Sequence, residues 1–431
     1  MMHRTIFALL MLLSCQCALM AQVDFKRLLE TYQHLHAHPE LSFYEKETSA
    51  YLAKEMRRIG YEVTEGIGGY GVVGVLRNGE GPVVMYRTDT DALPIVEETG
   101  LSYASKVVAK DEAGKEVGVM HACGHDMHMA VWLGAAEQLA ALRAQWKGTL
   151  VFIAQPAEER SGGAKAMLAD GLFERFPKPD YALALHVSST MAAGTVGYKA
   201  GFMMANVDMV DIEVYGKGGH GAYPHTTIDP VVIAARIIMA LQTIVSREVS
   251  PLEPAVITVG AIHGGTKGNV IPDEVKMELT LRSYSKEVRD ALIERIGRTI
   301  AGVAESAGVP EELMPKLTVR PEFTPALYND PALTARIAGA LAQKMGEEQV
   351  IEQASVMGGE DFGRYGLTDD NIPILMLRLG AVKEEKIAAA AAKNIRLPSL
   401  HSNKFAPQAE PTLKTGVRAV VVSIQELLTT D

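Results

Sequence analysis

Residues 203–318 interrupt this chain with a pattern unlike the sequence on either side. They read as an alternating strand, an apolar helix, two further strands, a second helix and a closing strand. The order β-α-β-β-α-β is that of a ferredoxin-like α+β sandwich. About 115 residues suffice for an independent domain. The rest of the chain must therefore build a second domain from two separate pieces.

The flanking pieces alternate short apolar strands with helices. Strand-like runs occupy residues 71–76, 82–87, 148–155 and 181–187, and an alanine- and leucine-rich helix spans 124–146. This alternation predicts an α/β domain whose mixed, mostly parallel sheet is covered by helices on both faces. A chain of 431 residues accommodates two such cores. We expect a leader over 1–21, an α/β domain built from 22–202 and 319–431, and the insertion over 203–318.

The first residues resemble a secretory leader. A basic start at Arg4 precedes an apolar run from Ile6 to Leu13, and small residues precede Gln22. The run is shorter than the ~20 residues that span a membrane, so it predicts a signal peptide cleaved after Ala21. The protein is then exported, to the periplasm or the medium. The alternative is a lipid anchor at Cys15, where "LLSC" loosely resembles a lipobox.

Composition excludes one class of partner. The formal net charge is −10, hydrophobic residues make up 48% of the chain, and no Lys/Arg tract occurs. Nucleic-acid binding proteins need a basic patch, so we expect no nucleic-acid partner.

Side chains that bind metals follow several of the predicted strands. Carboxyl ends of parallel strands are where α/β sheets build their sites. Thiolate, imidazole and carboxylate together suit Zn²⁺, and also Mn²⁺ or Co²⁺. Neighbouring residues of an extended backbone point opposite ways, so one of two adjacent glutamates can bind metal while the other serves as a base. The residues are Asp89 and Asp91 in "RTDTDALP", Cys123 and His125 in "HACGHD", Glu158 and Glu159 in "QPAEER", His186 in "ALHV" and His401 in "LHSNKF".

Each of these signals has a simpler interpretation when taken alone. A lone cysteine such as Cys123 is commonly a buried small hydrophobe. Paired glutamates are usually a solvated turn, and a histidine in an apolar strand is usually a satisfied core residue. Their joint occurrence at successive strand ends favours a metal site.

Seven motifs in this order resemble peptidase family M20, in particular its hippurate hydrolase, aminoacylase and indole-acetyl-amino-acid hydrolase branch. They are "RTDTDALP", "MHACGHDMH", "QPAEE", "GGHGAYPH", "GNVIPDE", "MGGEDF" and "LHSNKF". The resemblance covers essentially the whole chain after the leader. It implies amide-bond cleavage with two divalent metal ions in the large, catalytic domain. The small inserted domain is expected to act as a lid and to form a homodimer.

The resemblance also assigns roles to individual residues. The expected metal ligands are Cys123, His125, Glu159, His186 and His401. Cys123 would replace the bridging aspartate of other branches, Glu158 would be the general base, and Asp91 would orient a ligand. Asp89 falls where other branches have a histidine ligand, and its role stays open.

Three further residues are expected in the inserted domain. His220 matches the histidine that stabilises the developing oxyanion, often across the dimer. Asn269 and Arg282 are candidates for binding the substrate carboxylate, which a guanidinium matches with two parallel hydrogen bonds. The alternatives are a turn-capping role for His220 and a surface ion pair for Arg282. His128 is expected to support the site or pack beside it, and His36 to lie at a helix end.

The sequence thus predicts an exported, metal-dependent amidohydrolase that acts on N-acyl amino acids or small peptides. A dipeptidase or carboxypeptidase of the same fold and a catalytically silent metal-binding relative are the alternatives. The preferred acyl group, the metal and the stereochemistry stay open.

Overall fold

The computed structural model describes residues 23–428, so the predicted leader, 1–21, lies outside the described residues. The chain divides into two compact units, which we call the α/β unit and the sandwich unit. Within the described residues, the α/β unit contains 23–201, Asn329–Ala354 and 364–428. The sandwich unit contains Phe202–Tyr328 and Ser355–Gly363.

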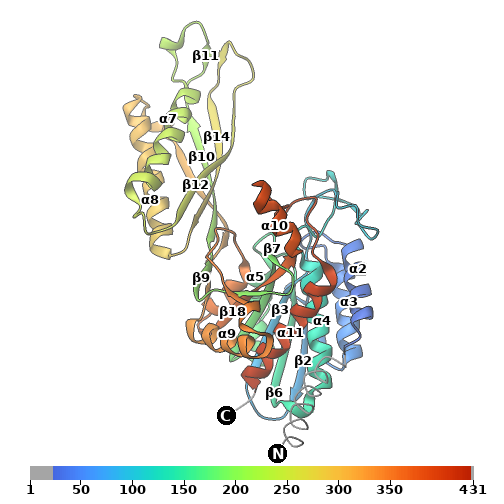
Figure 1. The fold of residues 1–431 in the computed structure, drawn as a ribbon. Helices are drawn as coiled ribbons and strands as arrows, with labels where there is room; N and C mark the ends of the chain where they lie inside the picture. The colour runs from blue at the N-terminus through green and yellow to red at the C-terminus, as the bar shows by residue number, and fades with distance from the viewer. Residues whose placement is uncertain (1–22, 429–431) are drawn as a thin grey trace, which may run out of the picture. The chain divides into compact units, whose positions relative to one another are not determined.

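An eight-stranded mixed sheet forms the centre of the α/β unit (Figure 1). The pairs β6–β3, β3–β7 and β7–β18 are parallel, whereas β1–β2, β2–β6 and β18–β8 are antiparallel. In spatial order the strands are β1 (Glu62–Ile67), β2 (Gly71–Asn78), β6 (Gly148–Gln155), β3 (Val83–Asp89), β7 (Tyr181–Ala192), β18 (Ile374–Val382), β8 (Val196–Tyr198) and β17 (Val350–Glu352).

Helices pack around this sheet because their apolar residues recur on one side. The main core combines sheet residues with the inward faces of α2, α3, α4, α9 and α11. Helix α4 is apolar almost all round and is buried along most of its length, as expected for a central helix. The helices are α2 (Phe25–Ala37), α3 (Lys46–Ile59), α4 (His125–Ala141), α5 (Gly163–Ala169), α6 (Leu172–Arg175), α9 (Pro331–Met345), α10 (Glu384–Lys393) and α11 (Ala409–Leu428).

The sandwich unit has the expected order of strands and helices. Its antiparallel sheet runs β12-β14-β10-β15, and α7 and α8 share a separate core with it. Asp229 caps α7 by accepting the N–H of Val231, and Pro230 occupies the first position of the helix, where proline is favoured. The elements are β10 (Asn206–Tyr215), β11 (Gly219–His220), α7 (Pro230–Thr243), β12 (Ala255–Gly264), β13 (Val270–Ile271), β14 (Glu274–Ser283), α8 (Lys286–Ser306) and β15 (Lys316–Thr324).

The sandwich unit extends further along the chain than the predicted insertion, 203–318. Strand β15 continues to Thr324 because it keeps pairing with β10 past a bulge. The stretch 355–363 also joins this unit, where the N–H of Ala205 donates to the carbonyl of Gly358. The prediction that all of 319–431 returns to the α/β domain is therefore wrong for these two stretches. Two short strands, β9 (Gly201–Met204) and β16 (Leu327–Asn329), lie where the chain passes between the units.

Helix α7 leaves part of its apolar surface uncovered. By length and composition the run Pro230–Glu248 could cross a membrane, but Ile233, Ile237 and Leu241 pack inside the sandwich core. On its other side, Met239 is 71% exposed and Val232 55% exposed. Exposed apolar residues on one helix face are typical of a surface that another molecule covers.

Candidate metal centre

Cys123 and His125 lie on either side of a sharp turn at the start of α4. Gly124 has φ +85°, and a side chain there would lie 2.6 Å from the methyl group of Val187, so only glycine fits. His125 is fully buried, and its Nδ1 donates to the carbonyl of Asp91 at 2.8 Å. This hydrogen bond fixes Nδ1 as a donor. Burial lowers the pKa of His125, but Asp89 and Asp91 outweigh it and raise the pKa well above the usual value, so a cation at Nε2 would bind in place of a proton.

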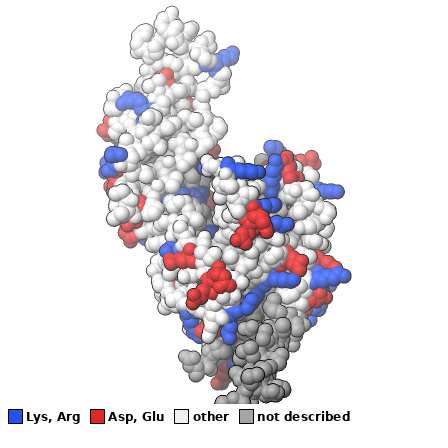
Figure 2. Space-filling view, in the orientation of Figure 1, with Lys and Arg blue, Asp and Glu red and all other residues white. Residues whose placement is uncertain are grey.

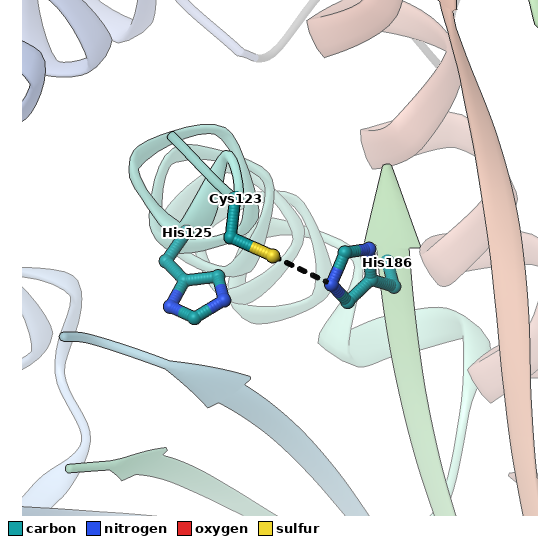
Figure 3. A group of neighbouring side chains, drawn as sticks. All are labelled: Cys123, His125 and His186. Atoms are coloured by element: carbon teal, nitrogen blue, oxygen red, sulfur yellow. Dashed lines mark hydrogen bonds between the residues drawn. The ribbon is translucent and has the colours of Figure 1, made fainter. Parts of the chain in front are cut away.

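His186 presents its Nε2 to the thiol of Cys123 at 3.4 Å (Figure 3). Its Nδ1 donates to the carbonyl of Val187 at 2.8 Å. Burial, together with His128 and Arg378, lowers the pKa of His186 well below the usual value. The ring is therefore neutral, which is the form that binds metals.

His401 reaches the same thiol from a distant part of the chain. Its Nε2 lies 3.3 Å from Cys123 Sγ and 3.3 Å from Glu159 Oε1. The N–H of His401 donates to the carbonyl of Ala122 at 2.9 Å, which ties this loop to the start of α4. The structure thus brings together residues that are 278 positions apart.

All five predicted ligands fall into two groups that share Cys123. One group is Cys123, His125 and His186, the other is Cys123, Glu159 and His401, and within each the ligand atoms lie within 4.8 Å of one another. Burial and the carboxylate of Glu159 raise the pKa of the Cys123 thiol, so a thiolate here requires a positive charge beside it.

Two buried atoms of this cluster show that a cation fits it. His125 Nε2 and Glu159 Oε1 are buried and make no hydrogen bond with any residue between 23 and 428, although Glu159 Oε1 has the ring of His401 at 3.3 Å as an ion-pair neighbour. A buried polar atom without a partner is costly, and a bound cation would satisfy both. A donor set of sulfur, nitrogen and oxygen suits Zn²⁺, Mn²⁺ or Co²⁺.

The two adjacent glutamates follow β6, but their predicted opposite directions are wrong. The Nε2 of His125 lies 4.0 Å from a carboxylate oxygen of Glu158 and 4.0 Å from one of Glu159. The backbone turns at this point rather than extending, because Ala157 adopts φ +49°. Both carboxylates therefore face the candidate metal centre.

Asp91 connects this turn to His125. Its carboxylate accepts the N–H groups of Glu158 (3.1 Å) and Glu159 (3.0 Å), and Ser42 donates its O–H at 2.6 Å. Its Oδ1 also lies 3.3 Å from His125 Nδ1. The Asp91 carboxylate thus contacts the ring of His125 and also holds the backbone of Glu159.

Asp89 and His128 form a buried network beside the centre. His128 Nδ1 donates to Asp89 Oδ1 at 2.7 Å, and its Nε2 accepts the N–H of Val187 at 2.9 Å. Arg87 donates to the other oxygen of Asp89 at 2.6 Å. Both ring nitrogens of His128 are therefore engaged, which leaves it no lone pair for a metal.

The remaining predicted residues lie in the sandwich unit. His220 is exposed on β11. The carbonyl of Asn269 accepts the N–H of the next residue, Gly221, so His220 and Asn269 lie close together. Arg282 is half-buried on β14 and donates to Thr280 Oγ1 at 3.1 Å. Within the described residues Arg282 forms no ion pair with a carboxylate, so the surface ion pair considered for it does not occur there.

Sequence patterns gave no role to Glu45, which is completely buried and accepts the N–H of Ala157. Glu40, Glu45 and Glu47 surround the start of α3, where acids are favoured by the helix dipole. That general explanation covers all three glutamates, so the sequence offers no signal that singles out Glu45.

The sequence and the fold are similar to those of known proteins. Residues 85–402 match the sequence profile of "Peptidase family M20/M25/M40". The chain is 40% identical to N-acetyl-L-cysteine deacetylase of Bacillus subtilis over 79% of this chain and 77% of that protein. It is 37% identical to hippurate hydrolase of Campylobacter jejuni over 86% and 95%, respectively.

A solved structure is similar over nearly the whole chain. It is a Bacillus subtilis protein described as a dinuclear metal binding peptidase from the M20 family, with a TM-score of 0.74 and 31% identity. The match covers 94% of this chain and 99% of that one. The fold, the ordered motifs and these similarities lead to one conclusion: the chain is a hydrolase that belongs to peptidase family M20/M25/M40.

Proposed function

We propose that this protein is a metal-dependent amidohydrolase that cleaves the amide bond of N-acyl amino acids. The observation that carries the proposal is the pair of ligand groups sharing the buried Cys123, with the carboxylate of Glu158 beside them. Cys123, His125, Glu159, His186 and His401 would hold two divalent cations. Glu158 belongs to neither of these two groups, although its carboxylate lies in a further group with His125 and Glu159. We assign proton transfer to it because it lies beside the five proposed ligands.

The chemistry divides between the cations and the protein. When bound, two divalent cations would polarise the amide carbonyl and lower the pKa of a water molecule. The Glu158 carboxylate accepts the proton of the attacking water and passes it to the leaving amine nitrogen. The C–N bond breaks, and a carboxylic acid and a free amino acid are released. Asp91 holds the backbone of Glu158 in place during both transfers.

The proposed substrates carry a free carboxylate. Two similar proteins are described as acting on N-acetyl-L-cysteine and on hippurate. Arg282 is half-buried and has no carboxylate partner among the described residues, so its guanidinium is available for such a group. Dipeptides also carry a free carboxylate, which keeps a dipeptidase or carboxypeptidase activity as the second candidate.

A small substrate panel tests the reaction. Purified protein is stripped of metal, reloaded with Zn²⁺, Mn²⁺ or Co²⁺, and assayed on acetyl-, benzoyl- and indole-acetyl-amino acids and on dipeptides. We expect metal-dependent release of the amino acid from at least one N-acyl compound. Cleavage of dipeptides alone would favour the peptidase, and no turnover despite bound metal would favour a silent metal-binding protein.

Replacement of Glu158 separates catalysis from metal binding. We expect Glu158→Gln to keep the metal content of the wild type and to lower kcat by about 10²–10⁴-fold, because the proton acceptor is lost. Glu159→Gln is the matched control, since it removes a proposed ligand and should lower the metal content. Hydrolysis by Glu158→Gln within a few-fold of the wild type would contradict the assignment.

We also propose export and self-association. The basic and apolar pattern before Gln22 supports cleavage after Ala21, which the N-terminal sequence of protein from the periplasm or medium would test.

The exposed apolar face of α7 supports a homodimer through the sandwich unit. Lysines, arginines and acids are interspersed over the α/β unit on the face shown in Figure 2.

A further inference from the structure

Three consecutive N–H groups at the end of β6 are accepted by two buried carboxylates. Ala157 donates to Glu45 Oε1 at 2.7 Å. Glu158 and Glu159 donate to the two oxygens of Asp91 at 3.1 and 3.0 Å. The first of these residues, Ala157, has φ +49°, a conformation that costs a non-glycine residue energy and needs support.

The carboxyl group of Glu45 is free to reach this turn because another residue caps its helix. Glu45 occupies the N-cap position of α3 but makes no side-chain capping bond. Glu40 instead accepts the N–H groups of Glu47 at 3.2 Å and Thr48 at 2.7 Å. Capping of α3 therefore does not explain why Glu45 is an acid.

Burial of Glu45 is also costly. Its side chain is completely inaccessible, and its Oε2 has no hydrogen-bond partner among residues 23–428. Burial and the nearby Asp91 raise the pKa of Glu45 to about 8. The carboxyl group is thus mostly protonated at neutral pH, and a glutamine of the same shape is a close substitute.

We propose that Glu45 is a positioning residue for the catalytic turn: by holding the N–H of Ala157, it keeps Glu158 and Glu159 directed at the metal centre. The inference rests on the proposed function, in which Glu158 transfers the proton and Glu159 binds metal. Asp91 fixes the second and third N–H groups, and Glu45 fixes the first. Loss of Glu45 would free the residue that starts the turn.

The test compares four variants of the full chain. Glu45→Ala removes the acceptor, Glu45→Met fills the space without one, and Glu45→Gln restores it. Glu47→Ala is the matched control, because Glu47 starts the same helix with its side chain 80% exposed. For each we would measure kcat and KM on an accepted substrate, and the affinity and visible absorption spectrum of bound Co²⁺.

We expect Glu45→Ala and Glu45→Met to lower kcat about 10–100-fold, the range for loss of a residue that supports a metal ligand, with KM changed less than kcat. Both should weaken Co²⁺ binding and alter its spectrum, because Glu159 loses its fixed backbone. Glu45→Gln should recover most of each property, and Glu47→Ala should match the wild type. If Glu45→Ala does not fold, Glu45→Met carries the comparison.

The Co²⁺ measurements separate this inference from the proposed function. If the wild type hydrolyses none of the panel, the proposed function fails, but the Co²⁺ spectrum still reports on Glu45. Unchanged kcat and an unchanged spectrum in Glu45→Met would overturn the positioning role. So would a Glu45→Gln variant as impaired as Glu45→Met, since the restored acceptor would then have no effect.

Discussion

Cys123 belongs to both candidate ligand groups, whereas His401 belongs to one of them. We therefore expect Cys123→Ala to bind less than about one divalent ion per chain, and His401→Ala to keep about one of the two. Metal analysis after dialysis against Zn²⁺ or Mn²⁺ measures this difference. Cys123→Asp is the control, because a carboxylate can also join two cations. Equal metal loss in Cys123→Ala and His401→Ala would argue against a shared thiol.

The types of the site residues could be predicted from the sequence, but the directions in which their side chains point could not. The recurrence of thiolate, imidazole and carboxylate at strand ends indicated eight candidate residues, and the resemblance to family M20 selected five of them as ligands. The direction of Glu158 depends on the left-handed conformation of Ala157, a residue that rarely adopts it. Glu45 supports that conformation from more than a hundred residues away, and no local pattern in the sequence reveals such a contact.

At the scale of elements, His36 joins α2 to the start of α4. Its Nδ1 lies 2.6 Å from Asp126, and its Nε2 lies 3.0 Å from Glu97. Burial lowers the pKa of His36, but the two carboxylates outweigh it and raise the pKa to about 10. The charged ring therefore stabilises the folded state fully below pH 6.5, its unfolded value, and this contribution is lost as pH rises toward 10.

Replacing His36 should remove this pH dependence. We expect the free energy of unfolding of the metal-free wild type to fall between pH 7 and 9.5 by an amount on the order of 2 kcal/mol more than that of His36→Gln. Urea unfolding at the two pH values measures it. His34→Gln, an exposed change on the same helix, should behave like the wild type. A pH-independent difference between wild type and His36→Gln would show that His36 does not carry the charge.

The four strands predicted before the insertion, 71–76, 82–87, 148–155 and 181–187, are present, but their ends differ where pairing extends a strand, and β1, β8 and β17 were not predicted. The apolar run 181–187 predicted that His186 ends its strand, but β7 continues to Ala192. It does so because β18 pairs with it beyond His186, whereas β3 leaves it after Ala184. His186 therefore lies two residues beyond the last β3–β7 pair and not at the end of its own strand. The sequence of one strand does not reveal how long its neighbours remain paired.

For the whole molecule, the order of elements predicted the sandwich insertion but not the return of 355–363 to it. That short stretch has no periodic pattern of its own, and it joins the sandwich unit through backbone hydrogen bonds such as that between Ala205 and Gly358. Any sequence can form such bonds, so composition gives no sign of them. The helical pattern of α7, by contrast, predicted both the helix and its apolar character.

The exposed side of α7 supports the last prediction, which concerns assembly. Val232 and Met239 are 55% and 71% exposed on one helix, and burying such residues between two copies would remove apolar surface from water. We expect the wild type to have the mass of a dimer in sedimentation or light-scattering measurements, and Met239→Glu that of a monomer. Ile395→Glu is the control, because Ile395 is also exposed, at 59%, but lies in the α/β unit. If His220 acts across the dimer, Met239→Glu should also lose activity while keeping its bound metal. A monomeric wild type, or a dimeric Met239→Glu, would assign the apolar face of α7 to a different partner.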